Sequence, residues 1–255
     1  MEEGAIRPHR SRYWLNPKIT DQKAHEIEVQ ALCDVYRSAK QLAAEGVRVI
    51  SCDEKTGMQA LQRAATTKTM APGHDEKREF EYIRHGTTCL TANLDVATGK
   101  LVSPTLGPTR DEKDFALHIL HTVASEPSSK WIFVVDNLTT HVSETLVRIV
   151  AKYDGLDVDL GVKGVRGILK NVESRRAFLV DTKHRIRFVY TPKHCSWLNQ
   201  IECWFSLLAR RVLRRGSFAS VDALNKAVVD FIDYFNRILA KPFKWTFTGR
   251  AAAAA

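Results

Sequence analysis

The sequence lacks the cysteine pattern of a disulfide-stabilised or zinc-binding protein. Its 255 residues include five cysteines, and none forms a C-x-x-C pair. They are Cys33, Cys52, Cys89, Cys195 and Cys203. An odd, widely spaced set argues against a disulfide framework and is typical of a reducing cytoplasm. His194, Cys195 and Cys203 have no fourth ligand at a usual spacing, which argues against a zinc site.

Long apolar runs are also missing. No run approaches the ~20 residues of a membrane-spanning helix, and the N-terminus lacks the apolar core of a signal peptide. We therefore expect a cytoplasmic, nucleoid-associated protein with no membrane partner. Hydrophobic residues make up 44% of the chain, enough for the core of one large domain.

Acidic residues are too few to balance the basic ones. The formal net charge of +9 predicts a polyanionic partner, with nucleic acid as the first candidate.

Two short apolar runs each end in an aspartate. The runs 47–53 and 131–136 finish at Asp53 and Asp136, and a polar turn is expected directly after each. Such β-branched runs favour central strands of a sheet that is covered on both faces. Carboxylates at the ends of neighbouring strands can converge. The alternative role for these two aspartates is to cap the strand ends.

A third carboxylate lies in a helix that follows a strand-like run. Pro192 ends the run 186–190, and apolar residues recur at helical spacing from about Leu198. Glu202 is expected at the edge of the buried face; its alternative role is a salt bridge to Arg185 or Lys193. Three acids form an all-oxygen site suited to Mg²⁺ or Mn²⁺, and a pair of ions could act on a phosphodiester.

The remaining pattern predicts a mixed sheet with helices on its faces. We expect helices at 21–44, 109–124, 143–152, from about 198, and at 220–239; a loop at 63–78; a β-meander over 80–102; and a strand at 186–190. Asp21, Ser143 and either Thr109 or Asp111 are the expected caps. This order matches an α/β fold of the ribonuclease H-like type, partly by analogy.

The chain divides into three expected segments. Residues 1–20 form a basic lead-in, 21–249 a catalytic domain, and 250–255 a tail. Within the domain, 153–185 reads as a basic insertion with one short helix. Both a solvated loop and a DNA-facing role are open for this insertion and for the lead-in.

Five phrases together resemble bacterial insertion-sequence transposases of the mariner-like superfamily. They are Cys52-Asp-Glu-Lys-Thr-Gly57, Arg84-His-Gly-Thr87, Val135-Asp-Asn-Leu-Thr-Thr-His141, His194-Cys-Ser-Trp-Leu-Asn-Gln-Ile-Glu202 and Leu239-Ala-Lys-Pro-Phe-Lys-Trp245. Each is weak alone, but five in the right order are specific.

This resemblance implies a DDE transposase that cleaves DNA at element ends and joins the freed 3′-hydroxyl to target DNA. Asp53, Asp136 and Glu202 match the three catalytic acids, which would bind two Mg²⁺ or Mn²⁺ ions. The partners implied are double-stranded DNA, as element ends and target, and a second copy of the chain, because joining two ends favours a homodimer.

Two departures from the family pattern are expected to matter. The helix-turn-helix domain with which members usually begin has no counterpart before the lead-in. The chain therefore reads as a second reading frame with a separate DNA-binding product, a truncated copy or a stand-alone catalytic domain. The insertion 153–185 also lengthens the spacing between Asp136 and Glu202.

Further residues are assigned supporting roles. The predicted DNA contacts are Lys193, His194, Arg210, Arg211, Arg214 and Arg215. Asn137 and His141 position metal or DNA backbone, or are simple turn residues. Asn199 precedes the catalytic helix with His194, where donors could meet a phosphate. Trp197 stacks on a base or, with more weight, packs in the core. Glu54 is expected to be structural.

Two alternative functions follow from the same residues. One is a non-enzymatic DNA-binding remnant that inhibits an intact transposase; the retained acids argue against it and the missing recognition domain argues for it. The other is a ribonuclease H-like nuclease acting on RNA–DNA hybrids, which fits the five phrases less well.

Overall fold

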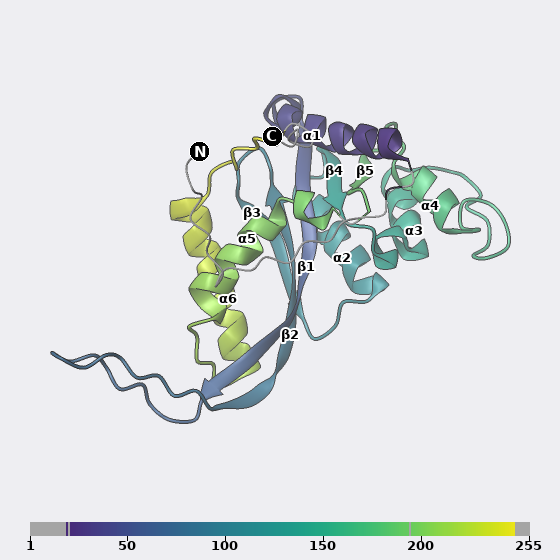
Figure 1. Cartoon of the computed structure of the whole chain (residues 1–255). Coiled ribbons are helices and arrows are strands. Elements are labelled where there is room, and N and C mark those ends of the chain that lie inside the picture. The colour runs from purple at the N-terminus through teal and green to yellow at the C-terminus, as the bar shows by residue number, and fades with distance from the viewer. Residues whose placement is uncertain (1–18, 20, 194, 248–255) are drawn as a thin grey trace.

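A mixed five-stranded sheet organises the chain (Figure 1). The structure, a computed structural model, describes residues 19, 21–193 and 195–247. The sheet has the order β3-β2-β1-β4-β5, formed by β1 (Val47–Arg63), β2 (Tyr82–Asp95), β3 (Leu101–Gly107), β4 (Lys130–Val135) and β5 (Ile186–Tyr190). The pairs β1–β2 and β2–β3 are antiparallel, whereas β1–β4 and β4–β5 are parallel. The predicted α/β architecture with a mixed sheet is confirmed.

Helices cover both faces of this sheet. They are α1 (Gln22–Ala44), α2 (Glu112–Ala124), α3 (Glu144–Tyr153), α4 (Val172–Leu179), α5 (Ile201–Leu208) and α6 (Val221–Tyr234). Side chains of β4 alternate between the faces: Phe133 packs with α2 and α3, and Val134 packs with α1. A third cluster joins α5 and α6 to β1 and β2. This two-sided burial explains why β4 reads as a continuous apolar run.

Local capping signals place the helix starts as expected. Asp21 caps α1, and Ser143 caps α3 through a hydrogen bond from the backbone N–H of Leu146. Of the two candidates for α2, Asp111 is the cap. These side chains accept from N–H groups that have no partner inside the helix, so the signal is readable from sequence.

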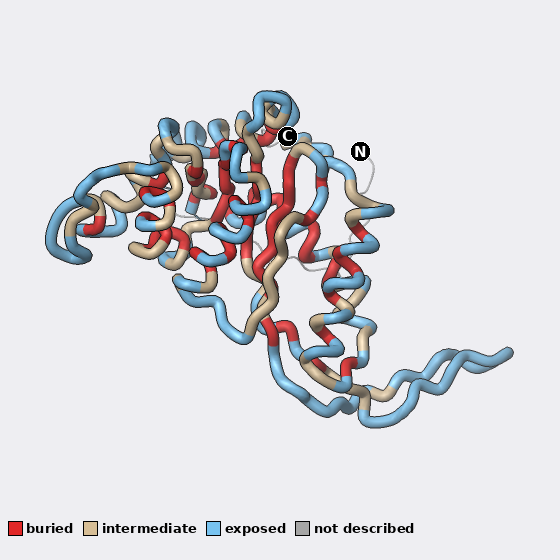
Figure 2. The backbone as a smooth tube through the Cα atoms, turned by 180° about the vertical axis from the view of Figure 1, so that it is seen from behind, coloured by how far each residue is buried: buried red, intermediate tan, exposed pale blue. Residues whose placement is uncertain are grey.

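The expected turn after Asp53 is wrong, because β1 continues to Arg63. Beyond Ser51 the strand loses its parallel partner β4 but keeps its antiparallel pairing with β2. The expected loop at 63–78 is part of a two-stranded arm, closed by bridges between Lys68 and Lys77 and between Ala71 and His74. Figures 1 and 2 show this arm projecting from the body, exposed along nearly its whole length.

The helix that carries Glu202 begins later than predicted. Ser196–Leu198 form a 3₁₀ turn, Asn199 has an extended backbone, and α5 starts at Ile201. After Leu208 the helix widens into a π-helical turn, Ala209–Leu213. Leu198 nevertheless keeps its place in the core, because the Tyr36 hydroxyl of α1 donates to its carbonyl at 3.0 Å.

The structure describes the predicted insertion, whereas nearly all of the predicted lead-in and the whole tail lie outside the described residues. Residues 153–185 contain one short helix, α4, as expected. The lead-in 1–20 lies outside the described residues except for Ile19, as does the tail 250–255. Along the described parts of the chain, no helix has the length and apolarity needed to cross a bilayer.

Candidate active site

Asp53 and Asp136 lie just beyond the last parallel pair of β1 and β4. Ser51 of β1 is level with Val134 of β4, and each aspartate follows two residues later. Asp53 is only 7% exposed, whereas Asp136 is half-buried. The negative charge of Asp136 helps to raise the pKa of Asp53, so the two carboxylates are electrostatic neighbours. The structure therefore brings together the two acids as the sequence predicts.

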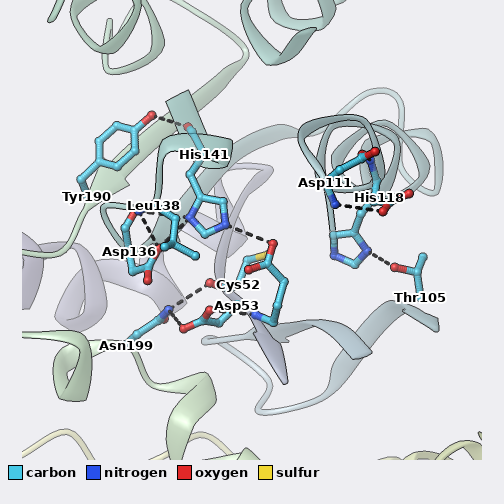
Figure 3. A network of polar contacts seen from close by, with 12 residues as sticks. Cys52, Asp53, Thr105, Asp111, His118, Asp136, Leu138, His141, Tyr190 and Asn199 are labelled. Atoms are coloured by element: carbon cyan, nitrogen blue, oxygen red, sulfur yellow. Dashed lines mark hydrogen bonds and ion pairs between the residues drawn. The ribbon is translucent and has the colours of Figure 1, made fainter. Parts of the chain in front are cut away.

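A buried histidine holds Asp136. His141 Nδ1 is 2.8 Å from Asp136 Oδ1, and His141 Nε2 is 3.3 Å from Glu54 Oε1 (Figure 3). The Tyr190 hydroxyl donates to the His141 carbonyl at 2.9 Å, and the Phe115 ring packs 4.1 Å from the imidazole centroid. We call this set, Glu54, His141 and Asp136, the histidine relay.

The relay favours a charged imidazole. Burial opposes protonation of His141, but the carboxylates of Asp136 and Glu54 outweigh it and raise its pKa to about 9. Burial likewise opposes ionisation of Asp136, yet hydrogen bonds from His141 and from the Leu138 N–H bring its pKa below the usual value. Asp136 is thus an ionised carboxylate with a built-in counter-charge.

Neutral groups hold Asp53. The Glu54 N–H donates to Asp53 Oδ1 at 2.7 Å, and Asn199 Nδ2 reaches Asp53 Oδ2 at 3.3 Å and the Cys52 carbonyl at 2.9 Å. Ser51 Oγ donates to Asn199 Oδ1 and accepts from the Ile201 N–H at 2.9 Å. We call Ser51 and Asn199 the amide bridge, because they tie β1 to the first residue of α5.

The electrostatics of Asp53 are the reverse of those of Asp136. Burial, followed by the charge of Asp136, raises its pKa to about 7, and Glu202 adds to the rise. No cation among the described residues forms an ion pair with it. The site therefore carries negative charge that the protein only partly compensates.

Glu202 lies in the first turn of α5, and its exposure differs from the prediction. Its neighbours Ile201 and Trp204 are buried, but Glu202 is exposed and not at the edge of the buried face. It forms no ion pair with any described residue, so the salt bridge to Arg185 or Lys193 is absent there. Its negative charge nonetheless adds to the rise in the pKa of Asp53, after burial and the charge of Asp136.

The donor set suits a hard divalent cation. Three carboxylates supply only oxygen, and both nitrogens of the buried His141 already face carboxylates. Within the described residues, no three acidic, histidine or cysteine side chains lie close enough to form a preformed metal cluster. A cation would relieve the mutual repulsion that raises the pKa of Asp53. The residues fit Mg²⁺ or Mn²⁺ in chemistry and in charge.

A cleft of about 300 Å³ opens beside Asp136. Lys193 lines it together with Asn137, whose side chain donates to the Thr191 carbonyl. His194, predicted as a DNA contact, lies outside the described residues. Lys193 is thus the predicted DNA contact that the structure places next to the acids.

Two other groups of predicted residues lie away from this cleft. The four arginines Arg210, Arg211, Arg214 and Arg215 are exposed along and after the π-helical turn. Trp197 is 55% exposed and touches Phe247 edge-on at 5.1 Å, so the expectation of core packing is wrong. Its neighbour Leu198 takes the core position.

Ser51 was not predicted from the sequence, and Glu54 was predicted to have only a structural role. Glu54 follows the first acid, and its side chain is 2% exposed because it contacts His141 from a distant part of the chain. A local signal for Ser51 existed, since it lies two residues before Asp53 on the same face of a strand. Nothing local indicated its partner Asn199.

Two acids lie just beyond the last parallel pair of β1 and β4, and a third lies in the first turn of the helix that follows the sheet. A family model described as DDE superfamily endonuclease matches residues 48–225, and the chain belongs to this family. No curated protein sequence matches the chain significantly.

Solved structures of Mos1 transposase share the fold. The Mos1 paired-end complex with the left transposon end has a TM-score of 0.54 at 13% identity, covering 92% of this chain and 63% of that chain. The Mos1 mariner paired-end complex with Mn has a TM-score of 0.54 at 14% identity and the same coverage. The Mos1 strand transfer complex has 0.53 at 14%, covering 92% and 62%. At this identity the likeness establishes the ribonuclease H-like fold, and the chain spans about 63% of the length of the Mos1 chain.

Proposed function

We propose that this chain is the catalytic domain of a DNA transposase. It hydrolyses DNA phosphodiesters at the ends of a mobile element and transfers the 3′-hydroxyl to target DNA. The observation that carries the proposal is the meeting of Asp53 and Asp136 just beyond the last parallel pair of β1 and β4, with Glu202 near enough to influence Asp53, in a DDE superfamily endonuclease.

Asp53, Asp136 and Glu202 are the proposed ligands of two Mg²⁺ or Mn²⁺ ions. When bound, such ions supply Lewis-acid stabilisation of the attacking and leaving oxygens. One similar structure is described as a mariner paired-end complex with Mn, which supports this ligand chemistry. The histidine relay keeps Asp136 ionised and oriented, and the amide bridge ties the first residue of α5, next to Glu202, to the strand that carries Asp53.

DNA is proposed to contact the positive groups around the cleft. Lys193 is best placed to meet a phosphate beside Asp136, and His194 follows it in sequence. The arginines from Arg210 to Arg215 would add affinity along the backbone without reading sequence. Similar Mos1 structures are described as complexes with a transposon end or after strand transfer, which supports double-stranded DNA as partner.

The finer assignments rest on the resemblance described above. We infer a bacterial insertion-sequence origin, a cytoplasmic and nucleoid-associated location, and a catalytic domain over 21–249 that includes the insertion 153–185. A homodimer and a separate helix-turn-helix product are the proposed protein partners.

The test is metal-dependent nicking and joining of DNA that carries the flanking inverted repeats. Asp53→Asn, Asp136→Asn and Glu202→Gln should each abolish cleavage and leave DNA binding largely intact. Asp230→Asn is the matched control, because this exposed acid pairs with Lys226 on α6, outside the site. Full cleavage by Glu202→Gln would remove it from the ligand set.

The same assay separates the two alternative functions. DNA binding without cleavage or joining, even with a helix-turn-helix partner added, would indicate a non-enzymatic remnant. Cleavage of RNA–DNA hybrids without strand transfer on DNA would indicate a ribonuclease H-like nuclease.

A further inference from the structure

A second hollow adjoins the cleft at Asp136. A groove of about 850 Å³ runs between the first half of α1, helix α4 and strand β5. It shares Asn137, Thr191 and Lys193 with the smaller cleft, so the two hollows meet at the end of β5. Its volume is in the range of ~300–1,000 Å³ that protein pockets use for ligands.

Arg187 lines this groove from β5 and has no compensating partner. Its side chain makes no hydrogen bond or ion pair with any described residue. Burial alone lowers the pKa of its guanidinium below the usual value. A desolvated cation without a carboxylate is destabilising, and proteins retain such conflicts mainly at functional sites.

Arg176 lines the same groove from α4. Its guanidinium lies 4.0 Å from the centroid of the Tyr190 ring, and it too lacks an ion pair with any described residue. The Tyr190 hydroxyl contacts His141, so this aromatic platform is joined to the histidine relay. Arg48 and Arg148, by contrast, form ion pairs with Glu126 and Glu144, each at 2.7 Å.

The groove is not uniformly positive. Asp21, Glu28 and Glu173 also line it, although Asp21 already accepts a hydrogen bond from the Ala24 N–H as the cap of α1. Because acids and arginines both line the groove, a general attraction of anions from a distance does not explain the two arginines without ion pairs. A planar guanidinium recognises a phosphate by short, directed hydrogen bonds, which suits a local anion site.

We propose that the groove binds the sugar-phosphate backbone of one DNA strand as it leaves the candidate active site, with one phosphate held by Arg187 and Arg176. This inference rests on the proposed function, because it takes the strand from the acids past Lys193 into the groove. It also gives the basic insertion, which contains Arg176, a DNA-facing role.

The test compares binding with folding stability. The probe is an inverted-repeat duplex with a single-stranded extension at the cleaved end, titrated without divalent metal. Arg187→Met and Arg176→Met should each weaken binding about 10-fold and make the salt dependence of log K shallower by about one. Arg187→Met should leave the melting temperature unchanged or raise it, because it removes an uncompensated charge. Arg187→Lys should restore part of the affinity.

The matched control is Arg148→Met, which removes the same charge from an arginine that is paired on α3. Its binding should equal that of the unsubstituted chain. Unchanged binding by both groove variants would overturn the inference while leaving the proposed function intact. A lower melting temperature in Arg187→Met, matching its loss of binding, would assign Arg187 a structural role.

The remaining outcomes separate this inference from the proposed function. Weaker binding by the groove variants, in a chain that cleaves no DNA, would support the groove and overturn the function. Absence of DNA binding by the unsubstituted chain, even with a helix-turn-helix partner added, would overturn both. Arginine-dependent binding of polyglutamate, without any such effect on DNA, would make the groove a protein-binding site and overturn the inference.

Discussion

Asp136 and Asp53 both lie just beyond the last parallel pair of β1 and β4, yet the protein holds them by different chemistry. Asp136 has an imidazole at 2.8 Å, and that imidazole is held in turn by Glu54. Asp53 has only a backbone N–H and the amide of Asn199, although it is the more buried of the two. One acid has its counter-charge inside the protein, and the other does not.

This difference suggests separate tasks within one site. Asp136 has its orientation and charge established by folding, because the relay is formed by the protein itself. Burial and the charges of Asp136 and Glu202 raise the pKa of Asp53, and the Glu54 N–H and His141 offset this only in part. A divalent cation would supply the remaining compensation under the proposed function.

The largest expected effect concerns the acids themselves. Asp53→Asn and Asp136→Asn should both abolish metal-dependent DNA cleavage, but their metal-free stabilities should diverge. Asp53→Asn removes a poorly compensated charge and should stabilise the fold by about 0.5–2 kcal/mol. Asp136→Asn takes a partner from His141 and should destabilise it. Urea unfolding without metal measures both, and equal shifts would contradict the comparison.

The next largest effect is expected from substitution of His141, the central residue of the histidine relay. His141→Ala leaves the buried Glu54 without a partner and should destabilise the fold by about 3–5 kcal/mol. The double variant His141→Ala with Glu54→Gln should recover part of this loss, because the side chain at position 54 is then neutral and no longer a buried charge without a partner. A double-mutant cycle by urea unfolding measures the coupling, which we expect at about 0.5–3 kcal/mol. Strict additivity would show that Glu54 and His141 act independently.

Breaking the amide bridge should reduce stability less than breaking the histidine relay, but it should still change catalysis. Asn199→Ala removes a neutral hydrogen-bonding group and should destabilise the fold by about 1–3 kcal/mol. Because the bridge positions α5 and Glu202, the Mn²⁺ concentration needed for half-maximal cleavage should rise about 10–100-fold. Ser51→Ala is the companion variant and should move the same requirement. An unchanged Mn²⁺ requirement would limit Asn199 to a structural role.

The smallest expected effect uses a second buried histidine as a reference for His141. His118 bonds only the Thr105 hydroxyl through Nδ1, at 2.9 Å, and burial lowers its pKa to about 3 (Figure 3). Between about pH 6.5 and 3 the unfolded chain therefore binds a proton that the folded chain does not. Stability should fall with decreasing pH by up to about 1.4 kcal/mol per unit from this group.

His118→Gln removes that contribution and should flatten the pH dependence of unfolding over this window. The measurement is urea unfolding at pH 6.5 and 5.5 for both chains. An identical slope in the variant would mean that His118 binds the same number of protons in the folded and in the unfolded chain over this window.

Features that depend on neighbouring residues could be predicted from the sequence. The run Trp131 to Val135 indicated a central strand because both of its faces are apolar, and Asp21 and Ser143 indicated helix starts because capping is local. The two aspartates follow from the same reasoning, since parallel strands present their carboxyl ends at one edge. Their catalytic role stays a prediction.

The sequence by itself therefore determined the elements, the α/β class and the two acids at strand ends. Only the tertiary structure decided what holds those acids. Glu54 and His141 are 87 positions apart, and Ser51 and Asn199 are 148 apart. Such pairs meet through the order and register of the sheet, which local patterns do not encode. The continuation of β1 past Asp53, the exposure of Trp197 and the unpaired state of Arg187 have the same origin. Each depends on what distant segments do or do not cover.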